Sequence, residues 1–149
     1  MLRKQDRYDE VLWTVLRIVA GGFLIPHGVQ KLLGMLSAQG SVALIAMFES
    51  KAGLVPGAPF VIGTGMVEAF GGLALAFGLL TRAAATAAVG ILVGAMLLVN
   101  GASGFFWTKG GIEYPLLWAI LCACFVVRGG GVHSIDARLT GSPGNESDT

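Results

Sequence analysis

The chain has 149 residues, of which 54% are hydrophobic and only 13% are charged, and its mean hydropathy is +0.74. Soluble domains carry about a quarter charged residues, so this composition excludes an ordinary soluble domain and favours an integral membrane protein of one domain. The formal net charge is +1 and the basic residues form no cluster, which excludes nucleic acid as an expected partner and leaves membrane lipid.

Four apolar segments approach the roughly 20 residues that a helix needs to cross a bilayer. They run over residues 11–33, 60–80, 83–99 and 112–127. Ala, Leu and Gly dominate them and alternation with a period of two is absent, which excludes strands. The sequence therefore predicts an all-α integral membrane protein, with a four-transmembrane-helix bundle as a membrane domain over residues 11–128.

The first segment contains "FLIPHGVQKLLG", in which Pro26 is expected to kink the helix and free a backbone carbonyl beside His27. The segment also contains Arg17 and lacks a small-residue cleavage site, so we interpret it as a retained helix rather than a signal peptide. After it, residues 41–51 combine a capping Ser41 with apolar and charged residues, which predicts a short interfacial helix between spans 1 and 2. A buried amphipathic helix is the alternative.

Only Thr81 and Arg82 separate the second and third segments, which predicts an antiparallel hairpin. Gly90 and Gly94 form a GxxxG on the third segment and are a candidate contact between helices or between copies of the chain. The fourth segment has only 13 uninterrupted apolar residues, from Pro115 to Val127, so residues 113 and 114 are expected at the headgroups.

Lys and Arg are distributed unevenly over the connections between these segments. Six lie on the side of the termini and three on the other side, which predicts that both termini are cytoplasmic. The expected location is the plasma (inner) membrane. Residues 1–10 are then a cytoplasmic N-terminal segment, and residues 129–149 form a cytoplasmic tail, predicted to be largely disordered apart from one turn around Ile135 and Leu139.

Charged residues inside the predicted spans lie on one face of each helix. Arg17, Gly21, Leu24, Gly28 and Lys31 share a stripe of the first span, and Glu68, Gly72, Leu75, Leu79 and Arg82 share a stripe of the second. Because an isolated charge in a bilayer is costly, we expect a structural ion pair between Arg17 and Glu68. Whether this pair only fixes helix register or also has a function stays open.

A second group of polar residues belongs to the outer halves of the spans and the outer connections, and it predicts a polar pocket that opens outward. The candidate binding residues are His27, Gln30, Lys31, Asn100, Trp107 and Tyr114, and the candidates for proton transfer are His27, Glu68 and Glu113. Metal-ligand spacings, phosphate loops and covalent-cofactor motifs are absent from the sequence, so neither a metal nor a covalent cofactor is expected.

The stretches "RIVAGGFLIPHGVQKLLG", "EAFGGLALAFGLLTR" and "NGASGFFWTKGGIEYPLL", followed by "HSIDARL", resemble the DoxX family of small bacterial and archaeal membrane proteins. The resemblance implies a four-helix membrane fold and a link to redox metabolism, since relatives are associated with thiosulfate:quinone oxidoreduction, with thiol handling and with quinone or catechol stress. The matched polar positions are Arg17, His27, Gln30, Lys31, Glu68, Arg82, Asn100, Glu113 and Tyr114.

Three functions stay open after this comparison. The first is a membrane subunit of an oxidoreductase that binds a quinone or a small sulfur or phenolic compound in the outer pocket, as part of a complex rather than as a stand-alone enzyme. The second is a non-catalytic scaffold that recruits soluble oxidoreductases. The third is a small-molecule permease, which would need a homo-oligomer because four helices enclose little volume.

Overall fold

The computed structural model describes residues 4–141, and every regular element in that range is a helix. Helices α1 (Lys4–Met35), α3 (Gly57–Met66), α5 (Thr81–Gly94) and α6 (Glu113–Arg128) lie in the four apolar segments. Two stretches of π-helix, η1 (Val67–Gly71) and η2 (Ala95–Asn100), continue α3 and α5. The other elements are α2 (Ala38–Ala52), α4 (Gly72–Phe77), η3 (Gly101–Ser103), η4 (Trp107–Lys109) and α7 (Ile135–Leu139).

Three helical runs are long and apolar enough to cross a membrane, namely Arg7–Met35, Gly57–Phe77 and Thr81–Ser103. They correspond to the first three predicted segments and make this a membrane protein by length and composition. The helix at the fourth segment, α6, has 16 residues and is about 24 Å long at ~1.5 Å per residue, whereas the hydrocarbon core is about 30 Å thick. Helix α6 is therefore shorter than a straight crossing of the hydrocarbon core.

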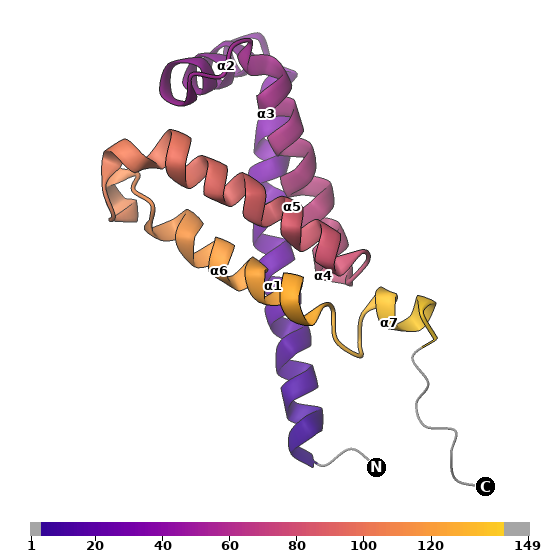
Figure 1. Ribbon diagram of the computed structural model, residues 1–149. Coiled ribbons are helices and arrows are strands. Elements are labelled where there is room, and N and C mark those ends of the chain that lie inside the picture. The colour runs from indigo at the N-terminus through magenta and orange to yellow at the C-terminus, as the bar shows by residue number, and fades with distance from the viewer. Residues whose placement is uncertain (1–3, 142–149) are drawn as a thin grey trace, which may run out of the picture.

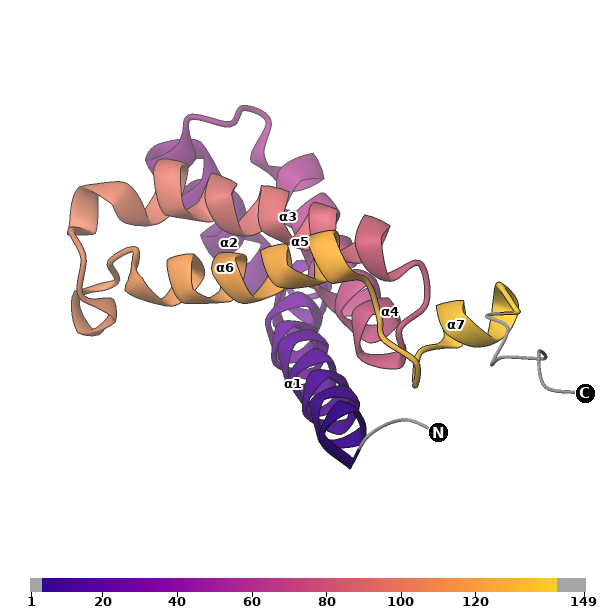
Figure 2. The same cartoon turned by 60° about the horizontal axis from the view of Figure 1, so that its bottom comes forward.

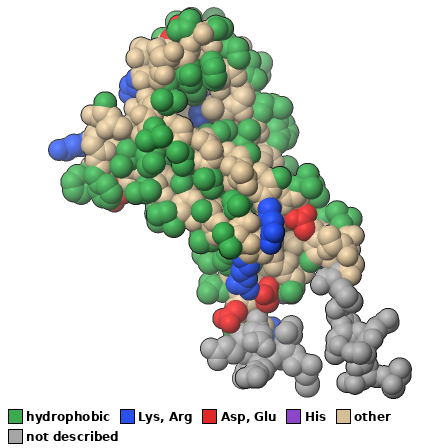
Figure 3. All heavy atoms as spheres, in the orientation of Figure 1, with side chains coloured by type: hydrophobic (Ala, Val, Ile, Leu, Met, Phe, Trp, Pro, Cys, Tyr) green, Lys and Arg blue, Asp and Glu red, His purple; other side chains and the backbone are tan. Residues whose placement is uncertain are grey.

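The helices are arranged in two pairs (Figure 1). The run α3–η1–α4 lies antiparallel along α1, which continues through Pro26 without a break. The second pair, α5–η2 with α6, crosses α1 obliquely, and the two helices lie side by side in both views (Figure 2). The described chain begins and ends at the same end of the molecule, and charged side chains gather toward that end on the face that Figure 3 shows.

Glycine allows the close approach of α1 to the second run. A methyl group added at Gly21 would collide with the Gly72 carbonyl, and one added at Gly28 would collide with the backbone of Ala69. Because burial of apolar surface does not drive helices together in lipid, such backbone contact is the main source of packing attraction. The two predicted stripes therefore face one another along the first helix pair.

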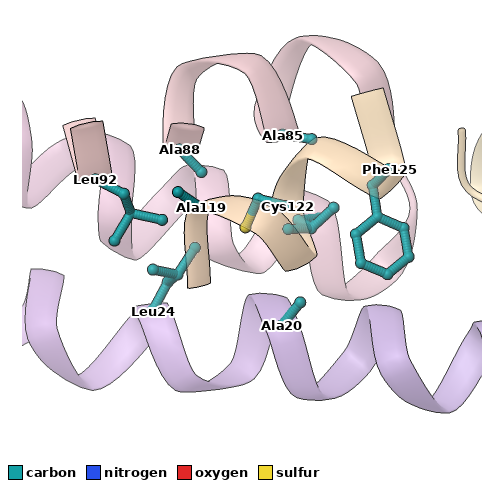
Figure 4. Packing of buried hydrophobic residues seen from close by; sticks show 9 residues of the cluster. Ala20, Leu24, Ala85, Ala88, Leu92, Ala119, Cys122 and Phe125 are labelled. Carbon is teal, nitrogen blue, oxygen red and sulfur yellow. The ribbon is translucent and has the colours of Figure 1, made fainter. Parts of the chain in front are cut away.

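The core lies between α1 and the second helix pair (Figure 4). Small residues, Ala85 and Ala88 on α5 and Ala119 on α6, bring these helices close together, while Phe125 fills the wider end of the interface. Cys122 is buried in this core, whereas Cys124 is exposed, as expected for two cysteines that point apart on a helix.

The connection after α1 contains the predicted short helix, with different bounds. Helix α2 begins at Ala38, and the side chain that caps it is Ser37, whose Oγ accepts a hydrogen bond from the N–H of Gly40 at 3.1 Å. The assignment of the cap to Ser41 was wrong, because serine also occurs four residues earlier at the chain reversal. Phe48 is buried against the first helix pair, while Val42 is 68% exposed. The location of α2 at the membrane interface stays a prediction.

The tail follows a defined path as far as Gly141. The predicted disorder of its remainder concerns residues 142–149, which lie outside the described range, as do residues 1–3. Helix α7 occupies the position of the predicted turn. The Asp136 carboxylate accepts hydrogen bonds from the N–H groups of Leu80 and Thr81, both at 2.7 Å, and so caps α5 from outside the helix. This contact holds Leu80 in a left-handed conformation, with φ of 47°.

The pKa of Asp136 is lowered in the folded protein. Burial alone would raise this pKa, but hydrogen bonds from Thr81 and Leu80 and the charge of Arg17 outweigh burial. A carboxylate with a lowered folded pKa stabilises the fold above its unfolded pKa of about 3.9, and this stabilisation is lost as the pH falls through the folded pKa.

We therefore expect Asp136→Asn to lower the apparent melting temperature of the detergent-solubilised protein at pH 7. The loss should correspond to about 1 kcal/mol, the usual contribution of a helix cap. The difference from the wild type should shrink below pH 4, which a melting series from pH 7 to pH 3 would measure. A difference that is independent of pH would mean that the charge of Asp136 does not contribute.

Candidate functional site

A cavity of about 560 Å³ lies between α1, η1, η2 and α6, where the two helix pairs diverge. We call it the aromatic cavity because three of its walls are aromatic side chains. Four of the six predicted binding residues line it, namely His27, Asn100, Trp107 and Tyr114. Glu68 and Trp118 line it as well.

The spacing of two aromatic residues on α6 brings their side chains together. Tyr114 and Trp118 are four residues apart and so lie on one face of the helix, with nearly parallel rings (13°) whose centroids are 5.3 Å apart. The indole N–H of Trp118 donates to the Ala20 carbonyl at 3.2 Å, which fixes the stack against α1. His27 packs beside this stack, with its ring centroid 5.9 Å from that of Tyr114 and its Nε2 3.5 Å from Tyr114 Oη.

Glu68 lies at the inner end of the aromatic cavity, on the π-helical stretch η1. Its carboxylate forms an ion pair with Lys31, and both side chains are largely withdrawn from the surface, at 10% and 20% exposure. Single-turn π-helical stretches often occur at functional sites, because the extra residue turns a side chain out of the regular helical pattern. The pair therefore places a titratable group beside the aromatic residues.

The expected pair between Arg17 and Glu68 was wrong in its partners. Arg17 donates to the carbonyls of Ala76 at 2.7 Å and Leu75 at 3.2 Å, and to that of His133 at 3.1 Å. In the antiparallel pair of helices, Arg17 is level with the end of α4, eight residues or about 12 Å from Glu68 at ~1.5 Å per residue. The carbonyls at that helix end lack partners within the helix and carry partial negative charge, which favours a guanidinium.

The connection from η2 to α6 forms one wall of the aromatic cavity, through Trp107, Gly110 and Gly111. Asn100 Nδ2 donates to the Gly110 carbonyl at 2.6 Å, and the carboxylate of Glu113 accepts from the Trp107 N–H at 3.1 Å. Glu113 therefore braces this connection and is not part of the cavity lining, although it was a candidate for proton transfer. Gln30, another candidate, is exposed on α1 and does not line the cavity either.

Trp118 belongs to the site but was not among the residues predicted for it. Trp118 contributes a wall of the aromatic cavity but was treated only as part of the fourth apolar segment. Its position four residues after Tyr114 was a usable signal, since residues at that spacing share a helix face. Within residues 4–141, no three His, Cys, Asp or Glu side chains come together as a metal site.

A comparison with family models finds the DoxX model over residues 12–101, which is more than half of the chain. The matched range contains His27, Lys31, Glu68 and Asn100 and ends before the aromatic residues of α6. Comparisons with curated proteins and with solved structures give no match. From the match over α1 to η2, the chain belongs to the DoxX family.

Proposed function

We propose that the aromatic cavity binds a small planar compound with ring oxygens, of the quinone or phenol class, and that the protein serves redox metabolism as a membrane subunit. The observation that carries the proposal is the stacked Tyr114–Trp118 face together with His27 and Glu68 in one cavity. A volume of about 560 Å³ lies within the usual range for small-molecule sites. Parallel aromatic faces favour a flat ring, which stacks in the same offset manner.

The polar groups suit the oxygens of such a ring. His27 offers a ring nitrogen at one side, and Glu68 offers a carboxylate at the inner end. Two-electron reduction of a quinone to a quinol takes up two protons, and imidazole and carboxyl groups are the side chains that most often transfer protons in such steps. The electrons would come from a partner oxidoreductase, so the protein would act within a complex.

The membrane topology that we propose has four spans, with α6 as the short fourth span. The end of the molecule at which the described chain begins and ends also holds Arg82, Arg128 and Arg138, and the opposite end holds Lys31, Lys51 and Lys109. This bias supports a topology in which both termini are cytoplasmic and the aromatic cavity opens toward the outer side of the inner membrane. A large exposed fraction of Leu12 (58%) and Phe23 (55%) suits contact with lipid.

We expect His27→Ala to weaken binding of a quinone without a side chain by about tenfold, the effect of losing one hydrogen bond in a partly dry site. Titration of 2,3-dimethoxy-5-methyl-1,4-benzoquinone into detergent-solubilised protein would measure it, because the ligand would quench Trp107 and Trp118. Gln30→Ala, an exposed change on the same helix, is the matched control and should leave the affinity unchanged.

The same titration tests the scaffold function, and a vesicle uptake assay tests the permease function. A scaffold predicts no saturable binding and no effect of His27→Ala, with recruitment of soluble partners dependent on the termini. A permease predicts uptake of the compound by vesicles that contain the protein. Equal affinities of the wild type and His27→Ala would argue against the aromatic cavity as the binding site.

A further inference from the structure

A second cavity, of about 440 Å³, lies between α2, α3, α5 and η2. We call it the apolar cavity because side chains such as Phe48, Phe60 and Leu98 make most of its wall. Phe60 and Leu98 are 42% and 46% exposed, so they mark a mouth on the side of the helices that would face hydrocarbon. Helix α5 packs against η1 and scarcely touches α3, which leaves this side open.

Two glycines keep the apolar cavity open. Gly90 and Gly94 both line it, and a methyl group added at either would meet no other part of the chain within 4 Å. The GxxxG on α5 therefore does not serve as a contact between helices of one chain, in contrast to Gly21 and Gly28 on α1. Its missing side chains leave space for another molecule.

The two cavities adjoin one another and share three lining residues. Glu68, Ala95 and Asn100 line both of them. Two of these residues, Ala95 and Asn100, begin and end η2, and Glu68 belongs to η1, so both π-helical stretches of the protein's described part meet at the boundary. Glu68 and Asn100 lie at this boundary, with the tyrosine and tryptophan rings on one side of it. The wall on the other side is mostly apolar, apart from Lys31, the ion-pair partner of Glu68.

We propose that the two cavities form one site for an amphiphilic ligand, whose planar oxygen-bearing ring lies in the aromatic cavity and whose apolar chain lies in the apolar cavity. The inference rests on the proposed function and names the class of compound: ring compounds that carry a long hydrocarbon chain and reach the site from the bilayer. Such compounds partition into the bilayer and are concentrated beside the cavity, and van der Waals packing of the chain against the cavity wall would favour them over analogues that lack the chain.

The test compares two probes on the purified full-length protein at one fixed detergent concentration. The first is 2,3-dimethoxy-5-methyl-1,4-benzoquinone, and the second is the same ring with a decyl chain. Gly94→Leu fills the apolar cavity, and Gly63→Leu is the matched control, because Gly63 is exposed on α3, lines neither cavity and also has open space beside it. Gly90→Leu is the second filling variant, for use if Gly94→Leu does not yield monodisperse protein.

We expect the filling variant to weaken binding of the decyl compound by about tenfold and to change binding of the short compound less than about twofold. Gly63→Leu should change neither. The inference is overturned if both probes lose affinity equally or if neither does. It is also overturned if the variant changes the oligomeric state and leaves the affinities for both probes unchanged. Failure of the proposed function gives a different result, namely that the short probe does not bind the wild type or is indifferent to His27→Ala.

Discussion

Replacing Lys31 by Met should lower the free energy of unfolding by about 3 to 5 kcal/mol, because Glu68 would lose its ion-pair partner in the helix interior. The double variant Lys31→Met with Glu68→Gln should recover most of this loss, since it removes both charges and leaves a neutral amide. Denaturant unfolding of the four proteins of this double-mutant cycle, in one detergent, would measure the coupling between the two side chains.

The Glu10–Arg128 pair provides a matched control for this cycle. Its Nη2–Oε1 distance is 2.6 Å, but the Arg128 side chain is 46% exposed, so water screens the charges. The corresponding neutral variants should cost less than about 1 kcal/mol. A Lys31→Met cost no larger than this would show that Glu68 is solvated in the folded protein and that the pair is not a buried one.

The Glu68→Gln variant also tests what the pair does besides stabilising the helices. Retained ligand binding with a reduced yield of folded protein would assign the pair to helix register alone. Weaker binding of the short quinone at unchanged yield would place the carboxylate in the binding site, as its position at the boundary of both cavities suggests.

Gly21→Ala should destabilise the protein by about 1 to 3 kcal/mol, because the added methyl group would push α1 away from the backbone of Gly72 and Ala76. Only backbone atoms stand in its way, so no side chain can rotate to make room. The neighbouring substitution Gly22→Ala should be neutral or stabilise by up to about 1 kcal/mol, since its methyl group meets nothing within 4 Å and alanine favours the helix.

Thermal unfolding of these two single-methyl variants would measure the difference, with matched chemistry and positions one residue apart. Similar melting temperatures for both would mean that α1 and α3–η1–α4 do not make the close backbone contact described above. The pair thus tests the helix packing independently of any ligand.

Much of the local structure follows from the sequence because it depends on neighbouring residues. Apolar runs predict the helices, a two-residue connection predicts the hairpin before α5, and glycines on one stripe predict the face by which α1 packs. The shared interior of the two charged stripes was predicted from the same periodicity. These features require only the 3.6-residue repeat and the size of each side chain.

The ion-pair partner of each charged residue, by contrast, depends on the alignment of the two helices along their axes. Both stripes have a charge at each end, and an antiparallel alignment brings Lys31, rather than Arg17, level with Glu68. That alignment is fixed where Gly21 and Gly28 meet the backbone of the facing helix, which belongs to a distant part of the chain. Helical periodicity predicts which face of a helix packs, but it does not determine how far one helix is shifted along its axis relative to its neighbour.

The sequence by itself determined that this is a helical membrane protein of the DoxX family and which face of each early span is polar. Only the tertiary structure decided that Arg17 holds the end of α4, that Asp136 caps α5, and that Glu68 separates an aromatic cavity from an apolar one. Cavities form where helices diverge, and divergence depends on crossing geometry and on the sum of all contacts along each interface. Such properties have no local signal in a chain of residues.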